Sequence, residues 1–199
     1  MRTVAVTGRS GSGKSSISAY LVKQGYPVCD ADQVARQVLL PGSGCIPLLQ
    51  ESFGEDIIAP DGSLRRRLLA DRAFKTPEGT QRLTDITHPA IQKIILKARD
   101  EAEKAGSRLF FIDGAVIVGT AMEKICDDIL LVYTPYEVAV NRICARDGIE
   151  PAMARRRLDA QMPLEALQRV AGYQLCNDGP LEEVYRALDD ILSQLLYKE

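Results

Sequence analysis

The chain has 199 residues, of which 46% are hydrophobic and 26% charged, with a formal net charge of −2. This length and composition are typical of one globular domain with a substantial core. The lack of a basic surplus argues against a nucleic-acid partner, and no apolar run reaches the roughly 18 residues typical of a membrane span.

The first predicted element is a short β-branched strand at residues 3–7, followed by a glycine-rich loop. Residues 8–15 read Gly-Arg-Ser-Gly-Ser-Gly-Lys-Ser, a complete G-x-x-x-x-G-K-[ST] motif, and residues 16–22 continue with helical spacing. Strand, loop and helix in this order form the context that the motif needs. The alternative, a glycine-rich turn that binds nothing, is disfavoured by this match. Because the strand begins at once, we also expect no signal peptide.

This loop predicts binding of a nucleoside triphosphate, since its backbone N–H groups and the helix N-terminus can surround phosphate oxygens. The lysine supplies a mobile cation for the β- and γ-phosphates, and the serine after it can ligate Mg²⁺. We therefore expect Mg²⁺ as cofactor, held by Ser15. The predicted ATP-binding residues of the loop are Gly11, Ser12, Gly13, Lys14, Ser15 and Ser16.

A second strand is predicted at residues 26–29, ending at Asp30, and the sequence Asp30-Ala31-Asp32 follows it. A carboxylate at this strand end is expected to face the γ-phosphate across the crevice, where a kinase needs a group that orients and deprotonates a hydroxyl. The alternative role for both aspartates is capping of the helix that begins near residue 33.

Residues 40–105 contain helical patterns, including an apolar stripe through Ile91 and Ile95, but no convincing strand. A crossover between parallel strands needs only about a dozen residues. The excess length predicts a helical subdomain, and a second substrate is the natural reason to have one.

Three further strands are predicted at residues 108–112, 129–133 and 173–176, and the last helix carries an apolar stripe from Leu181 to Leu195. The strands are almost continuously apolar, as expected when helices cover both faces of a sheet. We therefore predict an α/β fold with an open, five-stranded parallel sheet. Ligands of such sheets lie outside the carboxyl ends of the strands, where Asp113 ends the third.

Several other segments occur in a distinctive order along the chain. They are Phe53-Gly54, Asp61-Gly62, Leu64-Arg65-Arg66-Arg67-Leu68, Phe74, His88-Pro89-Ala90-Ile91, Arg142, Arg146-Asp147-Gly148, Ala160-Gln161-Met162-Pro163 and Asn177-Asp178-Gly179. Together with the loop and Asp-Ala-Asp, they make the chain resemble the dephospho-coenzyme A kinase family over nearly its whole length.

The resemblance implies ATP-dependent phosphorylation of the ribose 3′-hydroxyl of dephospho-CoA, giving CoA and ADP. It implies a three-layer P-loop fold with a core of residues 1–39, 106–140 and 172–199, a helical acceptor-binding subdomain at about 40–105 and a helical lid at about 141–171. The residues implied are Lys14, Asp32, Arg142 and Thr7 for catalysis, Arg146 and Asn177 for ATP, Asp32, His88 and Asp113 for the acceptor, and Asp32 or Asp113 as further Mg²⁺ ligands.

Four of these residues have simpler alternatives. Arg142 and Arg146 are spaced i, i+4 and could lie on a solvated helix face. Asn177 could form a turn in Asn-Asp-Gly. His88, before Pro89, could start a helix with its ring bonded to backbone.

The sequence departs from the family in two places. After Asp113 the family usually has x-Pro-Leu-Leu-aromatic-Glu, whereas residues 114–119 here read Gly-Ala-Val-Ile-Val-Gly. An Ala-Asp step normally precedes the last strand, and here it is Ala171-Gly172. We expect both changes to affect the acceptor rather than ATP.

Two other functions stay open at the level of sequence. One is a P-loop kinase of another small hydroxyl acceptor, such as a nucleoside, and the other is a nucleotide-binding module without phosphoryl transfer. The five scattered cysteines fit reduced thiols in a cytoplasm. No obligate protein partner is evident.

Overall fold

The computed structural model describes residues 1–197, and the chain divides into two compact units. One unit comprises residues 1–30 and the chain from Arg99 onward, and the other comprises residues 31–98.

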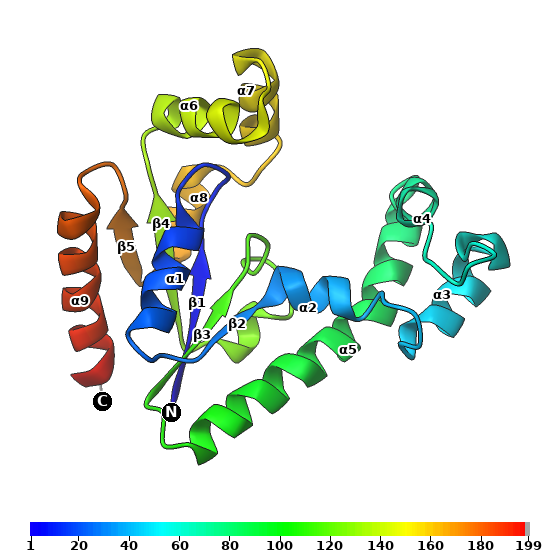
Figure 1. Cartoon of the computed structure of the whole chain (residues 1–199), viewed down its shortest axis with the longest axis horizontal. Coiled ribbons are helices and arrows are strands. Elements are labelled where there is room, and N and C mark those ends of the chain that lie inside the picture. The colour runs from blue at the N-terminus through cyan, green and yellow to red at the C-terminus, as the bar shows by residue number, and fades with distance from the viewer. Residues whose placement is uncertain (198–199) are drawn as a thin grey trace. The chain divides into compact units, whose positions relative to one another are not determined.

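A five-stranded parallel sheet forms the centre of the first unit, in the order β2-β3-β1-β4-β5 (Figure 1). All four neighbouring pairs are parallel, so the predicted fold class is confirmed. The strands are β1 Arg2–Thr7, β2 Val28–Asp30, β3 Leu109–Asp113, β4 Asp128–Tyr133 and β5 Tyr173–Cys176. Asp30 and Asp113 are the last residues of their strands. The sequence predicted strands that end one residue earlier, at residues 29 and 112.

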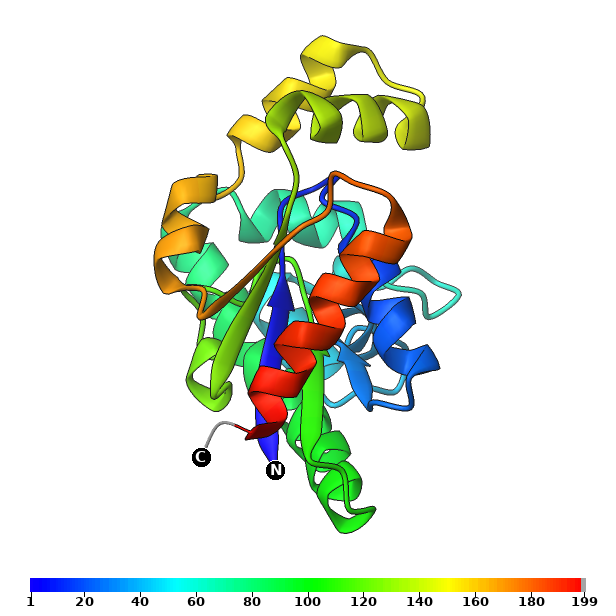
Figure 2. The same ribbon diagram turned by 90° about the vertical axis from the view of Figure 1, so that its left-hand side faces the viewer.

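Helices α1 and α9 cover one face of the sheet (Figure 2). Successive strand residues point to opposite faces, and this face carries Val4, Phe111 and Leu130, which pack against α1 and α9. The unit also contains η2 Glu123–Ile125 and three helices between β4 and β5. The helix bounds are α1 Lys14–Lys23, α6 Tyr136–Asp147, α7 Pro151–Asp159, α8 Leu164–Val170 and α9 Leu181–Tyr197.

The three helices between β4 and β5 divide into a packed pair and a single helix. A small apolar cluster joins α6 to α7 through Ala139, Ile143 and Leu158, all buried. The pair lies beyond the carboxyl end of β4, on the same side as the glycine-rich loop (Figure 2), whereas α8 packs on β4 itself. These are the helices that the sequence assigned mainly to a lid, and a lid role for them stays a prediction.

The unit of residues 31–98 is helical. Its elements are α2 Ala31–Gln37, α3 Cys45–Phe53, η1 Glu55–Ile57, α4 Arg66–Ala73 and most of α5, Pro77–Lys104. An isolated bridge between Ile58 and Leu64 provides its β pairing. The helical character expected for residues 40–105 is therefore observed, and its proposed role as an acceptor-binding subdomain stays a prediction.

The alternative role for His88, as a residue that starts a helix, is wrong. Both His88 and Pro89 lie inside α5, which begins at Pro77 and continues without interruption to Lys104. Pro89 lacks the N–H that would bond to the previous turn, but the buried face continues across it through Thr87, Ile91 and Ile95. A continuous buried face at helical spacing outweighs one missing hydrogen bond.

Candidate active site

The loop between β1 and α1 passes so close to its neighbours that Gly8, Gly11 and Gly13 leave no room for a side chain. A Cβ at Gly8 would lie 2.3 Å from the Val132 carbonyl oxygen, and one at Gly13 would lie 2.1 Å from Nδ2 of Asn177. Gly13 also has φ of +81°, which L side chains rarely adopt. The motif glycines are therefore required by the close packing of the loop as well as by its close approach to phosphate.

Two amide side chains from distant parts of the chain hold the backbone of this loop. Asn177 donates from Nδ2 to the Ser12 carbonyl at 2.8 Å. Gln161 accepts from the Ser10 backbone N–H at 3.0 Å through Oε1 and donates from Nε2 to Ser10 Oγ at 2.7 Å. Because each amide bonds to the backbone or to a loop hydroxyl, the loop conformation is fixed from both sides.

Lys14, at the first position of α1, forms an ion pair with Asp113 at the end of β3. Both side chains are largely buried, with exposed fractions of 17% and 10%. Asp30 is the register partner of Asp113 on β2, so two carboxylates end adjacent strands. The pair places the cation that the motif requires at the carboxyl edge of the sheet.

Four other residues predicted for the site lie in or beside the loop: Thr7, Gly11, Ser15 and Ser16. Ser15 and Ser16 lie in the first turn of α1, where the Ser16 N–H donates to the Gly13 carbonyl at 3.0 Å. Thr7 ends β1, is 1% exposed, and within residues 1–197 its Oγ1 has no hydrogen-bond partner. Gly11, at φ of +78°, completes the loop.

The residues here fit a bound Mg²⁺. This cation prefers oxygen ligands and takes one or two from the protein, with phosphate oxygens and waters for the rest. The Ser15 hydroxyl follows Lys14 directly, and a carboxylate oxygen of Asp113 lies against the Lys14 ammonium. The Ser15 hydroxyl and the Asp113 carboxylate are therefore both linked to Lys14, one along the chain and one through the ion pair. Together they are a suitable set of oxygen donors for Mg²⁺.

The two candidate lid arginines have different surroundings on α6. Arg142 is half-buried, and its Nη1 lies 3.4 Å from the Gly11 carbonyl oxygen. Arg146 is exposed and donates to both carboxylate oxygens of Asp147, at 2.7 and 2.9 Å. These hydrogen bonds raise the pKa of Arg146 and lower the pKa of Asp147. Only Arg142 of the two reaches the glycine-rich loop.

Asp32 and His88 belong to the helical unit of residues 31–98. Asp32 is exposed in the first turn of α2, where a carboxylate favours the positive helix end. It lies within the helix rather than at the position before it, which Asp30 occupies. His88 is half-buried on α5, and the parts of both residues in catalysis stay predictions.

Sequence reasoning assigned no role to Arg9 or Gln161. Arg9 donates from Nη2 to the Leu158 carbonyl, so the loop contacts the end of α7 as well as Gln161. A small cavity of about 40 Å³ lies here, and buried Nε of Arg9, Oγ of Ser12 and Oγ1 of Thr134 have no hydrogen-bond partner in the described chain. The only signal for Gln161 was its membership of the Gln-Met-Pro segment.

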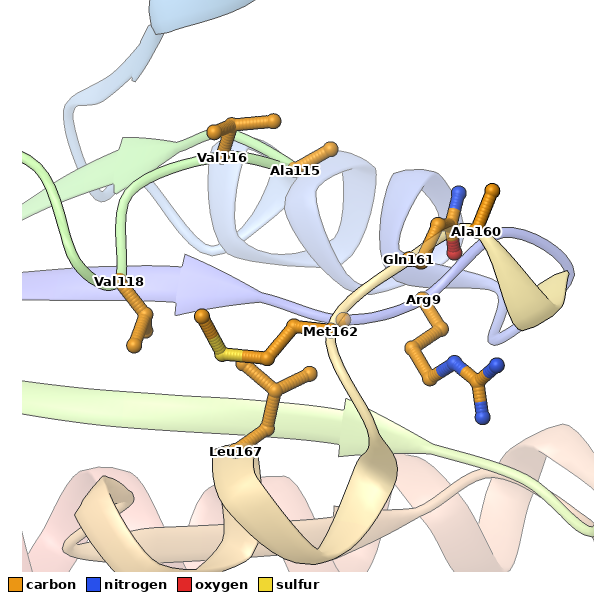
Figure 3. Close-up of a pocket in the computed structure, with 9 residues that line it drawn as sticks. Arg9, Ala115, Val116, Val118, Ala160, Gln161, Met162 and Leu167 are labelled. Carbon is orange, nitrogen blue, oxygen red and sulfur yellow. The ribbon is translucent and has the colours of Figure 1, made fainter. Parts of the chain in front are cut away.

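A larger cavity of about 340 Å³ opens beside the first residues of the loop (Figure 3). The tract after β3 forms one wall, and the α7–α8 connection with α8 forms the other. Its lining consists of Gly8, Arg9, Ala115, Val116, Val118, Ala160, Gln161, Met162 and Leu167. The tract that departs from the family pattern therefore borders a cavity next to the phosphate-binding loop.

A comparison with known protein families matches residues 2–183 to the dephospho-CoA kinase family. The chain belongs to this family.

Curated relatives agree with the assignment. The chain is 35% identical over 196 residues to a dephospho-CoA kinase of Corynebacterium efficiens, covering 98% of each chain. It is 33% identical over 195 residues to a dephospho-CoA kinase of Shouchella clausii, covering 98% of this chain and 99% of the relative. The resemblance inferred from the motifs is confirmed.

Solved structures show the same fold. The structure of TT1252 from Thermus thermophilus matches with a TM-score of 0.81 at 32% identity, covering 98% of this chain and 97% of that one. A dephospho-CoA kinase from Campylobacter jejuni matches with a TM-score of 0.63 at 22% identity, with the same coverage. None of the helices in residues 1–197 has the length and apolar character needed to cross a membrane.

Proposed function

We propose that this member of the dephospho-CoA kinase family transfers the γ-phosphoryl group of ATP to the ribose 3′-hydroxyl of dephospho-CoA, giving CoA and ADP. The observation that carries the proposal is the complete phosphate-binding loop, with Lys14 paired to Asp113 at the carboxyl edge of the sheet, in a chain whose relatives bear this name.

The loop and its cations account for nucleotide binding in this proposal. Backbone N–H groups of residues 8–15 surround the phosphates, and Lys14 moves from Asp113 to the β- and γ-phosphates. Arg142, already beside Gly11, adds positive charge where negative charge develops on the transferring phosphoryl group. Asn177 is proposed to contact ATP, although its amide N–H donates to Ser12, and Arg146 would have to leave Asp147 to do so.

The hydroxyl acceptor needs a base or an orienting group, and we assign this role to Asp32. His88 and Asp113 are proposed to contribute to acceptor binding. Ser15, with Asp113 or Asp32, would hold Mg²⁺, which neutralises phosphate charge when bound. We propose a cytoplasmic location, because CoA synthesis draws on ATP and the chain uses its cysteines as free thiols.

The test is incubation of the purified protein with Mg-ATP and dephospho-CoA, with ADP release followed by a coupled assay and the product identified by mass. We expect stoichiometric ADP and CoA. Matched reactions with adenosine, or with no acceptor, separate the alternatives. Faster phosphorylation of adenosine would favour a nucleoside kinase, and ATP binding without ADP release would favour a binding module.

A further inference from the structure

The cavity beside the loop has apolar walls with two polar members. Ala115, Val116 and Val118 come from the tract after β3, and Met162 and Leu167 come from the opposite wall. Four of the lining residues, Ala115, Val116, Ala160 and Met162, are exposed although they are apolar. An apolar surface left open next to a reaction centre is suited to an apolar part of a ligand.

Of the two polar lining residues, Gln161 is fully engaged elsewhere and Arg9 is engaged through one nitrogen, while its Nε has no partner in the described chain. Gln161 uses both amide atoms on Ser10. Arg9 donates to the Leu158 carbonyl, and Figure 3 shows its guanidinium directed away from Met162 and Val118. No carboxylate lines the cavity. A diphosphate between Met162 and Val118 would find no cation directed toward it, whereas a flat neutral ring needs none.

The cavity borders the reacting end of the loop. Gly8 and Arg9 are the first loop residues, whereas Asn177 contacts the loop at the other side, next to Gly13. A hydroxyl that accepts a phosphoryl group must come within about 3–3.5 Å of it. Because a ribose carries both that hydroxyl and its base, the base lies within one nucleoside length of the transferred group.

We propose that this cavity binds the adenine ring of dephospho-CoA, between the tract after β3 and Met162. The inference rests on the function proposed above and adds the part of the acceptor that the sheet unit recognises. Met162 runs toward Val118 and lies beside Leu167 (Figure 3), and its Cε would meet a Cβ at Gly119 at 3.8 Å. A flexible thioether at this place can adapt to a ring and contact it favourably.

The decisive experiment is NMR of the full chain labelled at its four methionine methyl groups, with Met162 assigned by Met162→Leu. A saturating non-hydrolysable ATP analogue is added first and dephospho-CoA second. A methyl group that lies over an adenine ring experiences its ring current, so we expect the Met162 methyl signal to move upfield at the second addition. Met153, exposed on α7 outside the cavity, serves as the control and should not move upfield.

Three results would overturn the proposal. The first is an unmoved Met162 signal at saturating dephospho-CoA. The second is an equal shift with 4′-phosphopantetheine, which would assign the cavity to the other half of the acceptor. The third is an upfield shift with the ATP analogue alone, which would assign it to the ATP base. A protein that neither binds nor phosphorylates dephospho-CoA would overturn the proposed function itself.

A kinetic comparison adds an independent measurement. Val118→Asp places a charge in the cavity, whereas Val170→Asp places one at the end of α8 outside it. We expect KM for dephospho-CoA to rise about tenfold or more for Val118→Asp, because burying a charge beside an apolar ring is costly, with KM for ATP unchanged. Equal effects of the two substitutions, or an effect on ATP alone, would contradict the assignment.

Discussion

Lys14 is held ready by a carboxylate rather than left mobile in solvent. Its ion pair with Asp113 is largely buried, so removal of the lysine leaves an unpaired carboxylate as well as a missing cation. Breaking such a pair destabilises a protein more than the pair itself stabilises it. Effects of a substitution here must therefore be separated into folding and catalysis.

We predict that Lys14→Ala lowers kcat by about 10²-fold or more, because the cation at the β- and γ-phosphates is lost. The measurement is steady-state ADP release by protein whose thermal unfolding shows that it is folded at the assay temperature. Lys23→Ala, at the other end of the same helix, is the control and should retain full turnover. If the Lys14→Ala variant is folded and its turnover is unchanged, the loop is not the phosphate-binding element of the active site.

The position of Asp32 allows two roles, and a substitution can distinguish between them. As an acceptor base it matters for turnover, and as a first-turn carboxylate it matters for α2. We predict that Asp32→Asn abolishes nearly all turnover while Kd for ATP changes by no more than about threefold. Kd is measured by calorimetry and turnover by coupled ADP release. A folded variant that turns over normally would leave only the helix role.

At the scale of elements, the loop is shaped by what packs against it. Gly13 and Gly25 have similar backbone angles, with φ of +81° and +85°. A Cβ at Gly13 would collide with Asn177, whereas one at Gly25 meets nothing within 4 Å. The two positions therefore share conformational strain and differ in crowding.

We predict that Gly13→Ala raises KM for ATP at least about tenfold, because Asn177 must leave the Ser12 carbonyl and the phosphate cradle is displaced. Gly25→Ala costs about 1–2 kcal/mol of backbone strain but should leave KM for ATP unchanged. Urea unfolding measures the stability that each variant loses through backbone strain. Steady-state kinetics measures the difference between the variants in KM for ATP. Equal KM values in the two variants would show that the Asn177 contact is not needed for nucleotide binding.

The tract of residues 114–119 offers a test at the same scale. It borders the cavity beside the loop, and its glycines make it costly to order. We predict that a variant with Pro, Leu, Leu, an aromatic residue and Glu at 115–119 has a lower KM for dephospho-CoA and an unchanged KM for ATP. An aromatic side chain at 118 can stack on a bound ring. If only KM for ATP changes, the tract is not an acceptor determinant.

The sequence predicted the elements better than the contacts between them. The strands were recognisable because Val4–Val6 and Leu109–Ile112 are apolar at every position, as strands buried on both faces must be. The Gln161–Ser10 contact spans 151 residues, and no local pattern encodes a partner at that distance. For the same reason Lys14 was assigned to phosphate while its resting partner, Asp113, was not foreseen.

At the scale of the whole molecule, two exposed ion pairs contribute to the response to acid. Hydrogen bonds from Arg146 lower the pKa of Asp147, and those from Arg72 lower the pKa of Asp56. Each carboxyl therefore binds a proton more weakly in the folded chain than in the unfolded chain. Their stabilisation is complete above the ordinary aspartate pKa of 3.8 and is lost as the pH falls through the lower folded values.

We predict that the urea midpoint of the protein falls between pH 5 and pH 3, and that Asp147→Asn shows a smaller fall. The variant should be less stable than the wild type at pH 5, and the difference between the two midpoints should be smaller at pH 3. Asp190→Asn, at an exposed position of α9, is the matched control. A difference between wild type and Asp147→Asn that stays constant across this range would contradict the role of the pair.

The contacts of Asn177 and Gln161 with the loop have a consequence for folding of the chain during its synthesis. Synthesis of the phosphate-binding sequence precedes that of the side chains that hold it, because Gln161 and Asn177 lie about 150 residues further along the chain. Its strand, β1, also waits for β3 and β4 on either side, and such non-local pairing is slow to form. A nascent chain therefore contains the complete motif before it contains the side chains that hold the loop in place. We therefore expect a truncated product that lacks β5 and Asn177 to bind ATP much more weakly than the full chain.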